Sequence, residues 1–169
     1  MKSLLIGCGN SRDMKVKWGE VTEFGELTTI DMNPDCGADI VMGLPQPRLP
    51  FEDGRFDHLA AYDSLEHWGS QGDWRGFFDE FAEYHRILKP GGTFGILVPI
   101  GEDAIADPGH TRFFNENWFC MLSQNFYKLA LEDKQPITDY RWYWGLNFDV
   151  LLLQRIEGHH LAVVLRKPL

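Results

Sequence analysis

Two glycines and a carboxylate stand where a nucleotide-type ligand could bind. Gly7 and Gly9 follow the apolar run of residues 3–6, and Asp31 closes a second apolar run, residues 27–30. Because glycine lacks a Cβ, a turn here can adopt positive φ and let backbone N–H groups approach a ligand. A carboxylate after the next strand can accept hydrogen bonds from ribose hydroxyls. This spacing predicts an adenosine-type ligand at the carboxyl ends of two neighbouring strands.

Three further side chains could act on a bound substrate. Asp63 follows a predicted strand over residues 55–62, and its carboxylate could align or deprotonate an acceptor, with a structural turn as the alternative. His67 and His110 carry imidazoles that titrate near neutral pH and could act as bases; a hydrogen-bonded structural role is the alternative for each. Arg112 could bind an anionic acceptor through two parallel hydrogen bonds or could simply be solvated. We therefore take Asp63, His67 and His110 as catalytic candidates.

The composition fits one globular domain over residues 1–169. Hydrophobic residues make up 44% of the chain and aromatic residues 14%, which suffices for a core. Lys plus Arg number 16 against 25 Asp plus Glu, a net charge of −9, so we expect no nucleic-acid substrate. No apolar run approaches the roughly 20 residues of a membrane span, and no signal sequence precedes the first strand. We expect no membrane association and a cytoplasmic location.

The cysteines predict neither a disulfide nor a metal site. Cys8, Cys36 and Cys120 are widely separated and show no Cys-x-x-Cys spacing, so we interpret them as free thiols in a reducing compartment. Cys8, between the two glycines, is interpreted as a small space-filling residue rather than a nucleophile. No other group of residues has metal-ligand spacing, and we expect no metal.

Predicted strands and helices alternate through the first hundred residues. Apolar runs predict strands over residues 1–6, 26–31, 38–42, 55–62 and 93–99. We predict a helix over residues 11–24, capped by Asn10 or Ser11 and ended by Gly25. Apolar residues at three- and four-residue steps predict a second helix over residues 73–88, with the apolar stripe in the core. This alternation is typical of a parallel sheet built from βαβ units.

The pattern changes after residue 99. It predicts a polar loop, a helix, a strand and an irregular aromatic segment over residues 101–112, 115–124, 126–131 and 135–145. Two apolar runs, residues 149–154 and 161–165, flank a Glu157-Gly158 turn, which indicates an antiparallel hairpin. The sequence therefore predicts an α/β protein whose mostly parallel sheet ends in that hairpin.

Four segments resemble the motifs of the class I S-adenosylmethionine-dependent methyltransferases, in particular the small-molecule type with a minimal core domain. In the family's order, they are residues 4–11, 29–34, 49–57 with 64–67, and 83–92. The resemblance implies a Rossmann-like doubly wound sheet whose antiparallel seventh strand is residues 161–166. It also implies S-adenosylmethionine as cofactor, S-adenosylhomocysteine as product and a small-molecule acceptor.

The resemblance assigns cofactor contacts to eight residues: Gly7, Cys8, Gly9, Asn10, Asp31, Met32, Leu44 and Tyr62. The glycine motif would hold the methionine part and Asp31 the ribose, although Asp31 or Asn10 could instead cap a helix. Tyr62 and Asp63 would stand where the fourth strand opens into the active site. Methyl transfer is an in-line displacement at a sulfonium-activated carbon, so such an enzyme supplies mainly proximity and alignment, and a base only where the acceptor must lose a proton.

Three features depart from the family's pattern. Leu5 stands where many members have an acid, and Gly43 stands where an aspartate often reaches the adenine. The chain also begins at its first strand, so we expect no lid helices. The loop at residues 101–112, the aromatic segment near Trp142 or a second subunit, as in a homodimer, could replace the lid.

Two other functions stay open at this point. Without a lid and two contact acids, the fold could be a non-catalytic S-adenosylmethionine-binding module or a partner subunit. A Gly-x-Gly turn with a later acid also suits a nicotinamide-dependent oxidoreductase. Arg12 in place of a third glycine disfavours the oxidoreductase.

Overall fold

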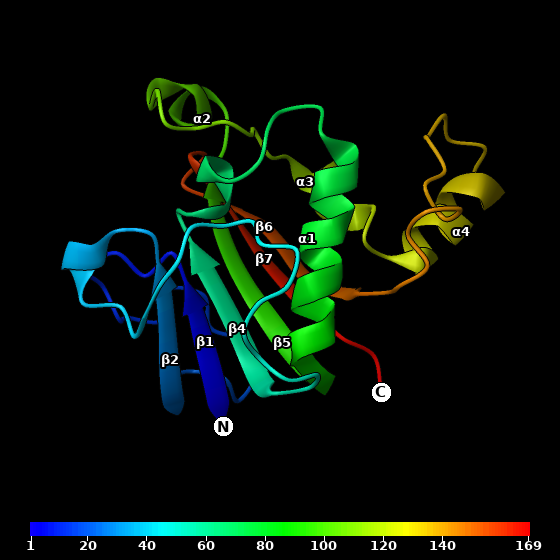
Figure 1. The fold of residues 1–169 in the computed structure, drawn as a ribbon. Helices are drawn as coiled ribbons and strands as arrows, with labels where there is room; N and C mark the ends of the chain where they lie inside the picture. The colour runs from blue at the N-terminus through cyan, green and yellow to red at the C-terminus, as the bar shows by residue number, and fades with distance from the viewer.

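A seven-stranded sheet forms the centre of the computed structural model, which describes all residues, 1–169 (Figure 1). Its strands are β1 (Lys2–Ile6), β2 (Glu26–Asp31), β3 (Ile40–Val41), β4 (Phe56–Tyr62), β5 (Leu88–Pro99), β6 (Asp149–Ile156) and β7 (His160–Arg166). They lie in the order β3-β2-β1-β4-β5-β7-β6. The pairs among β1 to β5 are parallel, whereas β7 is antiparallel to both β5 and β6. The predicted mostly parallel sheet with an antiparallel C-terminal hairpin is confirmed.

The long helix α1 (Trp74–Ile87) crosses one face of the sheet (Figure 1). Asp73 caps its N-terminus, because the carboxylate accepts a hydrogen bond from Gly76 N at 3.0 Å. The apolar and aromatic side chains that α1 buries recur at helical spacing: Phe77, Phe78, Phe81, Tyr84 and Ile87. The predicted helix over residues 73–88 and its core-facing stripe are confirmed.

The other helices are short. They are the 3₁₀ turns η1 (Pro34–Cys36) and η2 (Leu65–His67) and the helices α2 (Glu102–Ala106), α3 (Glu116–Cys120) and α4 (Gln124–Glu132). Asn115 caps α3 by accepting a hydrogen bond from Asn117 N at 3.0 Å, so the predicted helix starts as expected but ends at Cys120. No helix combines the length and apolar character that crossing a bilayer requires.

The predicted helix over residues 11–24 is wrong. Residues 10–25 are irregular, apart from a bridge in which Trp18 and Val21 exchange backbone hydrogen bonds of 3.0 and 2.9 Å. Arg12 donates hydrogen bonds of 3.1 and 3.0 Å to two carbonyls at the end of η1. The side chain thus finds its partners on a neighbouring loop, and such tertiary contacts override local helix propensity. Because this helix is absent, the capping roles predicted for Asn10, Ser11 and Gly25 are wrong as well.

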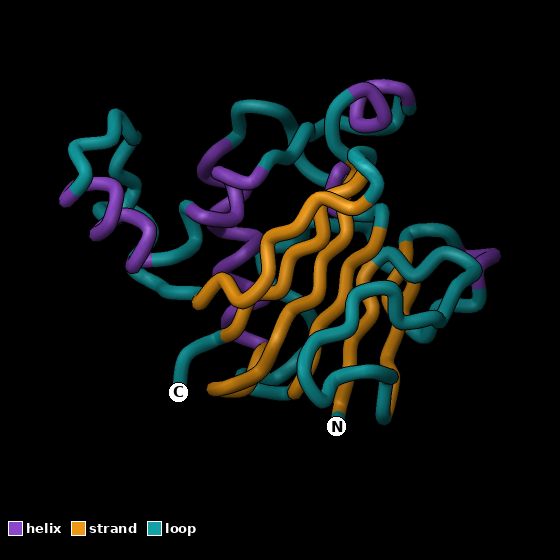
Figure 2. The backbone as a smooth tube through the Cα atoms, turned by 180° about the vertical axis from the view of Figure 1, so that it is seen from behind, coloured by secondary structure: helices purple, strands orange, loops and turns teal.

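The irregular segment at residues 10–25 covers the face of the sheet opposite α1. Figure 2, seen from that side, shows loop rather than helix over the strands near the N-terminus. Val16 is buried there with Ala60 and Val164 in a small apolar cluster, and Phe24 packs against its edge. The larger core lies on the α1 side of the sheet.

The predicted strand over residues 126–131 is also wrong, because these residues belong to α4. Tyr127 and Ala130, three residues apart, face the protein, whereas Leu129 and Leu131 are about half exposed. A short apolar run does not by itself distinguish a strand from a helix. The spacing of the buried side chains is helical.

Strand β5 begins earlier than the predicted start at residue 93. Leu88 pairs with Phe56, and the register then shifts before the regular pairing resumes. Gly91 N donates to Lys167 O at 2.8 Å, and Lys167 N donates to Gly92 O at 2.9 Å. The glycines are therefore a bend within the strand rather than a turn before it.

A buried ion pair joins α1 to the loop that follows α2. Arg112 Nη2 lies 2.7 Å from Glu80 Oε2, and neither side chain is more than 2% exposed. The same nitrogen donates to Leu65 O at 2.9 Å. Both expectations for Arg112, binding an anionic acceptor and being solvated, are wrong, because its charge connects α1, η2 and this loop.

Gly7 lies where only a hydrogen atom fits between the end of β1 and the turn after β4. Its φ is +64°, and a Cβ there would overlap Ser64 Cβ and lie 2.7 Å from Ser64 Oγ. Ser64 Oγ in turn donates to Ile6 O at 3.1 Å. The two strand ends are thus in direct contact.

We expect Arg112→Ala to lower the free energy of unfolding by about 3–5 kcal/mol, because it leaves Glu80 charged and buried without its partner. Urea unfolding followed by circular dichroism measures this loss. Lys128→Ala, at an exposed position on α4, is the control and should change stability by less than about 0.5 kcal/mol. A loss for Arg112→Ala as small as that of the control would contradict the assigned role.

We expect Gly7→Ala to destabilise the fold by about 2–4 kcal/mol, since it adds both a clash with Ser64 and an unfavourable φ. Gly9→Ala is the matched control, because Gly9 also has a positive φ of +48° but a Cβ there would meet no protein atom within 4 Å. Gly9→Ala should lower the free energy of unfolding by about 1–2 kcal/mol, the cost of a positive φ for a residue with a Cβ. Equal losses in the two variants, measured by thermal unfolding, would show that the contact with Ser64 is unimportant.

Candidate functional site

The carboxyl ends of three parallel strands meet at one edge of the sheet, the upper edge in Figure 1. Ile6 at the end of β1 pairs with Ile30 in β2 and with Ala61 in β4. The loops that follow these strands therefore lie side by side. Between them is a cavity of about 300 Å³, here called the strand-end cavity, lined by Gly7, Gly9, Asp31, Met32, Asp63, Ser64, His67 and Trp68.

Asp31 is held against the glycine loop by both carboxylate oxygens. Oδ2 accepts a hydrogen bond from Gly9 N at 2.7 Å, and Oδ1 accepts one from Asn33 N at 2.8 Å. Gly7 N donates to Ile30 O at 2.8 Å. The N–H groups that we expected to approach a ligand are thus bonded within the protein. Each carboxylate oxygen has a second lone pair, so Asp31 is the polar group that a ligand's hydroxyls would meet.

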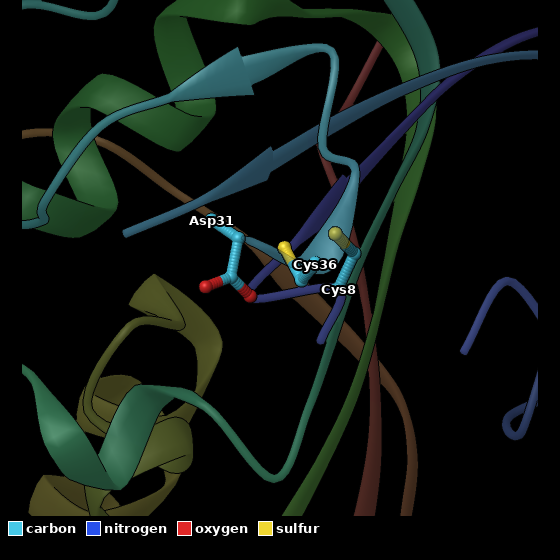
Figure 3. A group of neighbouring side chains, drawn as sticks. All are labelled: Cys8, Asp31 and Cys36. Atoms are coloured by element: carbon cyan, nitrogen blue, oxygen red, sulfur yellow. The ribbon is translucent and has the colours of Figure 1, made fainter. Parts of the chain in front are cut away.

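Two cysteines meet beside Asp31. Figure 3 shows Cys8 from the glycine loop and Cys36 from η1 next to this carboxylate, and one ligand atom of each side chain lies within 4.8 Å of the others. Burial raises the pKa of Cys8 to about 11, so its thiol is protonated at neutral pH, and Cys36 Sγ donates to Asn33 O at 3.1 Å. All three cysteines of the chain are free, as predicted. Cys8 is therefore a neutral thiol, and Cys36 is buried beside it.

Asp63 lines the cavity, and its carboxylate lies between Lys15 and His160. Its backbone has a positive φ of +50°. Oδ2 lies 2.7 Å from Lys15 Nζ, and Oδ1 lies 3.0 Å from His160 Nε2. Oδ1 has no hydrogen bond, whereas Oδ2 would have to leave Lys15 to act as a base.

Tyr62 lies on the other side of the sheet from the strand-end cavity. Its side chain is buried in the apolar cluster that contains Val16, and burial raises its pKa to about 12. It lines a separate small cavity with Cys8 and Lys15. Tyr62 does not line the strand-end cavity, and its contact with a cofactor stays a prediction.

The remaining predicted cofactor contacts lie in different places. Met32 lines the strand-end cavity and is 60% exposed. Asn10 is exposed directly after the glycine loop. Leu44 packs against the large core and does not line the cavity.

His67 and His110, on loops far apart in the sequence, meet beside the cavity. Their ring centroids are 4.7 Å apart, with the rings at 73° to each other. His67 lines the cavity and is exposed, whereas the His110 side chain is only 9% exposed. Glu66 completes the group, with Oε1 3.9 Å from His110 Nε2, and burial raises its pKa to about 7. Sequence reasoning missed Glu66 as a site residue; the signal available was a carboxylate directly before His67.

The aromatic segment near Trp142 does not cover the strand-end cavity. Its rings surround Trp74 at the start of α1, with centroid distances of 5.2 Å to Tyr140, 5.7 Å to Trp142 and 5.1 Å to Tyr143. Trp74 and Tyr140 line a second cavity of about 280 Å³ that shares no lining residue with the first.

Comparison with solved structures shows the same fold. The putative methyltransferase in the Haloferax volcanii complex with the Trm112 methyltransferase activator is 16% identical, with a TM-score of 0.57 over 99% of this chain and 83% of that one. The Burkholderia thailandensis 1,6-didemethyltoxoflavin-N1-methyltransferase, with bound 1,6-didemethyltoxoflavin and S-adenosylhomocysteine, is 16% identical, with a TM-score of 0.56 over 99% and 71%. A Methanosarcina mazei S-adenosylmethionine-dependent methyltransferase is 15% identical, with a TM-score of 0.56 over 99% and 92%.

The sequence comparison identifies the family. No curated protein sequence is significantly similar to the chain. A family model described as a methyltransferase domain, however, matches residues 4–96, more than half of the sequence. This match contains the glycine loop, Asp31 and η2, the segments that surround the strand-end cavity. The chain therefore belongs to the S-adenosylmethionine-dependent methyltransferases with a class I, Rossmann-like fold.

Proposed function

We propose that residues 1–169 act as one domain that transfers the methyl group of S-adenosylmethionine to a small-molecule acceptor. The observation that carries this proposal is the position of Asp31. Its carboxylate is held by Gly9 N and Asn33 N at the strand-end cavity, with lone pairs that suit ribose hydroxyls. When bound, the cofactor supplies a methyl group activated by its sulfonium.

The glycine loop fits the rest of the cofactor. A Cβ at Gly9 would meet no protein atom within 4 Å, so a ligand can approach the backbone closely at this point. Gly7 and Met32 line the same cavity. We assign the methionine part to the glycine loop and the ribose to Asp31. Tyr62 and Leu44 have no direct contact in this assignment.

The acceptor is proposed to bind on the His67 side of the cavity. Of the group formed by Glu66, His67 and His110, His67 is the member that lines the cavity. Alignment of the acceptor accounts for most of the catalysis in a displacement of this kind.

The charge of the chain supports a small acceptor. The net charge of −9 disfavours a nucleic acid. The Burkholderia neighbour acts on a small heterocycle, and the Haloferax neighbour binds an activator subunit. The loop at residues 101–112, which carries His110, or a second subunit, identical or not, is the proposed substitute for the lid.

Asp31→Ala should weaken binding of S-adenosylhomocysteine by about 1.5–3 kcal/mol, the range of hydrogen bonds to a charged group. Titration calorimetry measures the change. Asp35→Ala, which removes an exposed carboxylate on η1, is the matched control and should bind like the parent. Unchanged affinity in Asp31→Ala would refute the ribose assignment, and binding of NAD instead would favour an oxidoreductase.

His110→Ala should keep its affinity for S-adenosylhomocysteine but lose about tenfold or more in turnover, because the change affects the acceptor side. Turnover is measured as S-adenosylhomocysteine released with a panel of small acceptors. His159→Ala, at an exposed histidine, is the control. Equal turnover in His110→Ala and parent would remove His110 from the site. Tight cofactor binding without any methylated product would favour the non-catalytic binding module.

A further inference from the structure

Glu66, His67 and His110 together have the donor set of a transition-metal site. One ligand atom from each lies within 4.8 Å of the other two. Two imidazoles and one carboxylate are a common set of three protein ligands for zinc. Around an ion with bonds of about 2.1 Å, ligand atoms lie roughly 3.4 Å apart. The group therefore needs to contract by at most little more than an ångström.

Both histidines are hydrogen-bonded in the way that metal-binding histidines are. His110 Nδ1 lies 2.8 Å from Ala104 O, and His67 Nδ1 lies 3.1 Å from Gly109 O. A carbonyl can only accept, so each Nδ1 carries the proton and each neutral ring has its lone pair on Nε2. Metal-ligating histidines typically donate their second ring N–H to such a group, which fixes the tautomer and the ring orientation.

The carboxylate of Glu66 lacks the hydrogen bonds that a buried acid needs. The residue is 1% exposed, and Oε2 is buried without a hydrogen-bond partner. Oε1 lies 3.9 Å from His110 Nε2, which is beyond hydrogen-bond distance. Arg112, the buried cation of this region, is already paired with Glu80. An unpartnered buried carboxylate is rare in folded proteins, and a bound cation would compensate it.

The backbone holds the three ligands in place. Thr111 N and Arg112 N both donate to Glu66 O, at 2.8 and 3.1 Å, and the Thr111 hydroxyl lies 3.3 Å from the same carbonyl. These bonds tie the loop that carries His110 to η2. Such preorganisation by surrounding hydrogen bonds is what a metal site requires.

The cysteine group beside Asp31 is less suited to a cation. Asp31 already accepts two backbone hydrogen bonds, and Cys36 Sγ donates to a carbonyl. Its sulfurs bind metal only as thiolates. By contrast, Glu66 Oε2 has no hydrogen-bond partner, and each histidine uses only Nδ1 for its bond to a carbonyl.

We infer that Glu66, His67 and His110 bind one divalent transition-metal ion, with zinc as the reference ion, and that its open coordination positions take an oxygen atom of the methyl acceptor. Three protein ligands leave such positions open, as in catalytic rather than structural zinc sites. His67 belongs both to this group and to the lining of the strand-end cavity, which connects the ion to the acceptor side. This last part rests on the proposed methyltransferase function, and it names the acceptor class as molecules with a carboxylate, phenol or hydroxyl oxygen.

The test is zinc titration of tag-free protein that has been stripped with a chelator, followed by calorimetry. The parent chain should bind one zinc ion, and His67→Ala and His110→Ala should each weaken binding by about tenfold or more. His159→Ala removes an exposed histidine that pairs with Asp103, and it should bind zinc like the parent. His67 is exposed, so its replacement does not threaten the fold. Cys36→Ser tests the alternative group and should leave zinc binding unchanged.

Cobalt reports which atoms coordinate. The Co²⁺-loaded parent should show visible bands without thiolate charge transfer, and acetohydroxamate, a probe that binds through oxygen, should shift them. Zinc binding that is absent, or that survives both histidine changes, or that is lost in Cys36→Ser, would overturn the site. An unshifted spectrum would overturn the open position. S-adenosylhomocysteine binding is measured on the same samples. If the protein binds S-adenosylhomocysteine but not zinc, the metal site alone is overturned. If it binds zinc but not S-adenosylhomocysteine, the methyltransferase function and the acceptor assignment are overturned.

Discussion

The rest of the site depends on how closely β1 approaches the turn after β4. Gly7 and Ser64 are in contact without room for a side chain between them, and Ser64 Oγ is bonded to the carbonyl of Ile6. This contact places the loop that holds Asp31 next to the turn that carries His67. The glycine is therefore required by the packing of the protein itself as well as by a ligand that approaches the loop.

Buried charge organises the other half of the site. The Glu80 and Arg112 pair connects α1 with the loop after α2, and the same guanidinium bonds to the carbonyl of Leu65 in η2. A buried ion pair contributes little net stability compared with apolar packing, but a single partner left alone is costly. The pair thus restricts where this loop can lie, and it thereby positions His110, which belongs to the same loop. Glu66 is buried nearby without a comparable partner.

The two faces of the sheet are covered in different ways. A parallel sheet has to be covered on both faces; α1 does so on one, whereas irregular residues 10–25 do so on the other. Val16 supplies apolar cover, while Arg12 and Lys15 bind to loops at the strand ends. The same segment therefore covers the sheet and fixes the loops around the strand-end cavity, including Asp63, the partner of Lys15.

Local patterns in the sequence determined the strands, α1 and the glycine loop followed by Asp31. Each depends on residue spacing over a few positions, such as the alternation or helical period of apolar side chains. The same patterns failed for residues 11–24 and 126–131, where the conformation depends on partners outside the segment. The short apolar run at residues 126–131 fits either a strand or a helix, whereas residues 11–24 form neither.

Tertiary structure alone decided which polar groups meet. His67 and His110 come together because Thr111 N bonds to the carbonyl of Glu66, and a backbone hydrogen bond of this kind has no side-chain signature in the sequence. The sequence did not identify Glu80 as the ion-pair partner of Arg112 either, since any buried acid on a neighbouring element could form such a pair. The sequence by itself determined most of the strands, α1 and the position of Asp31 after the strand that follows the glycine loop, whereas the group of Glu66, His67 and His110 exists only through contacts between distant loops.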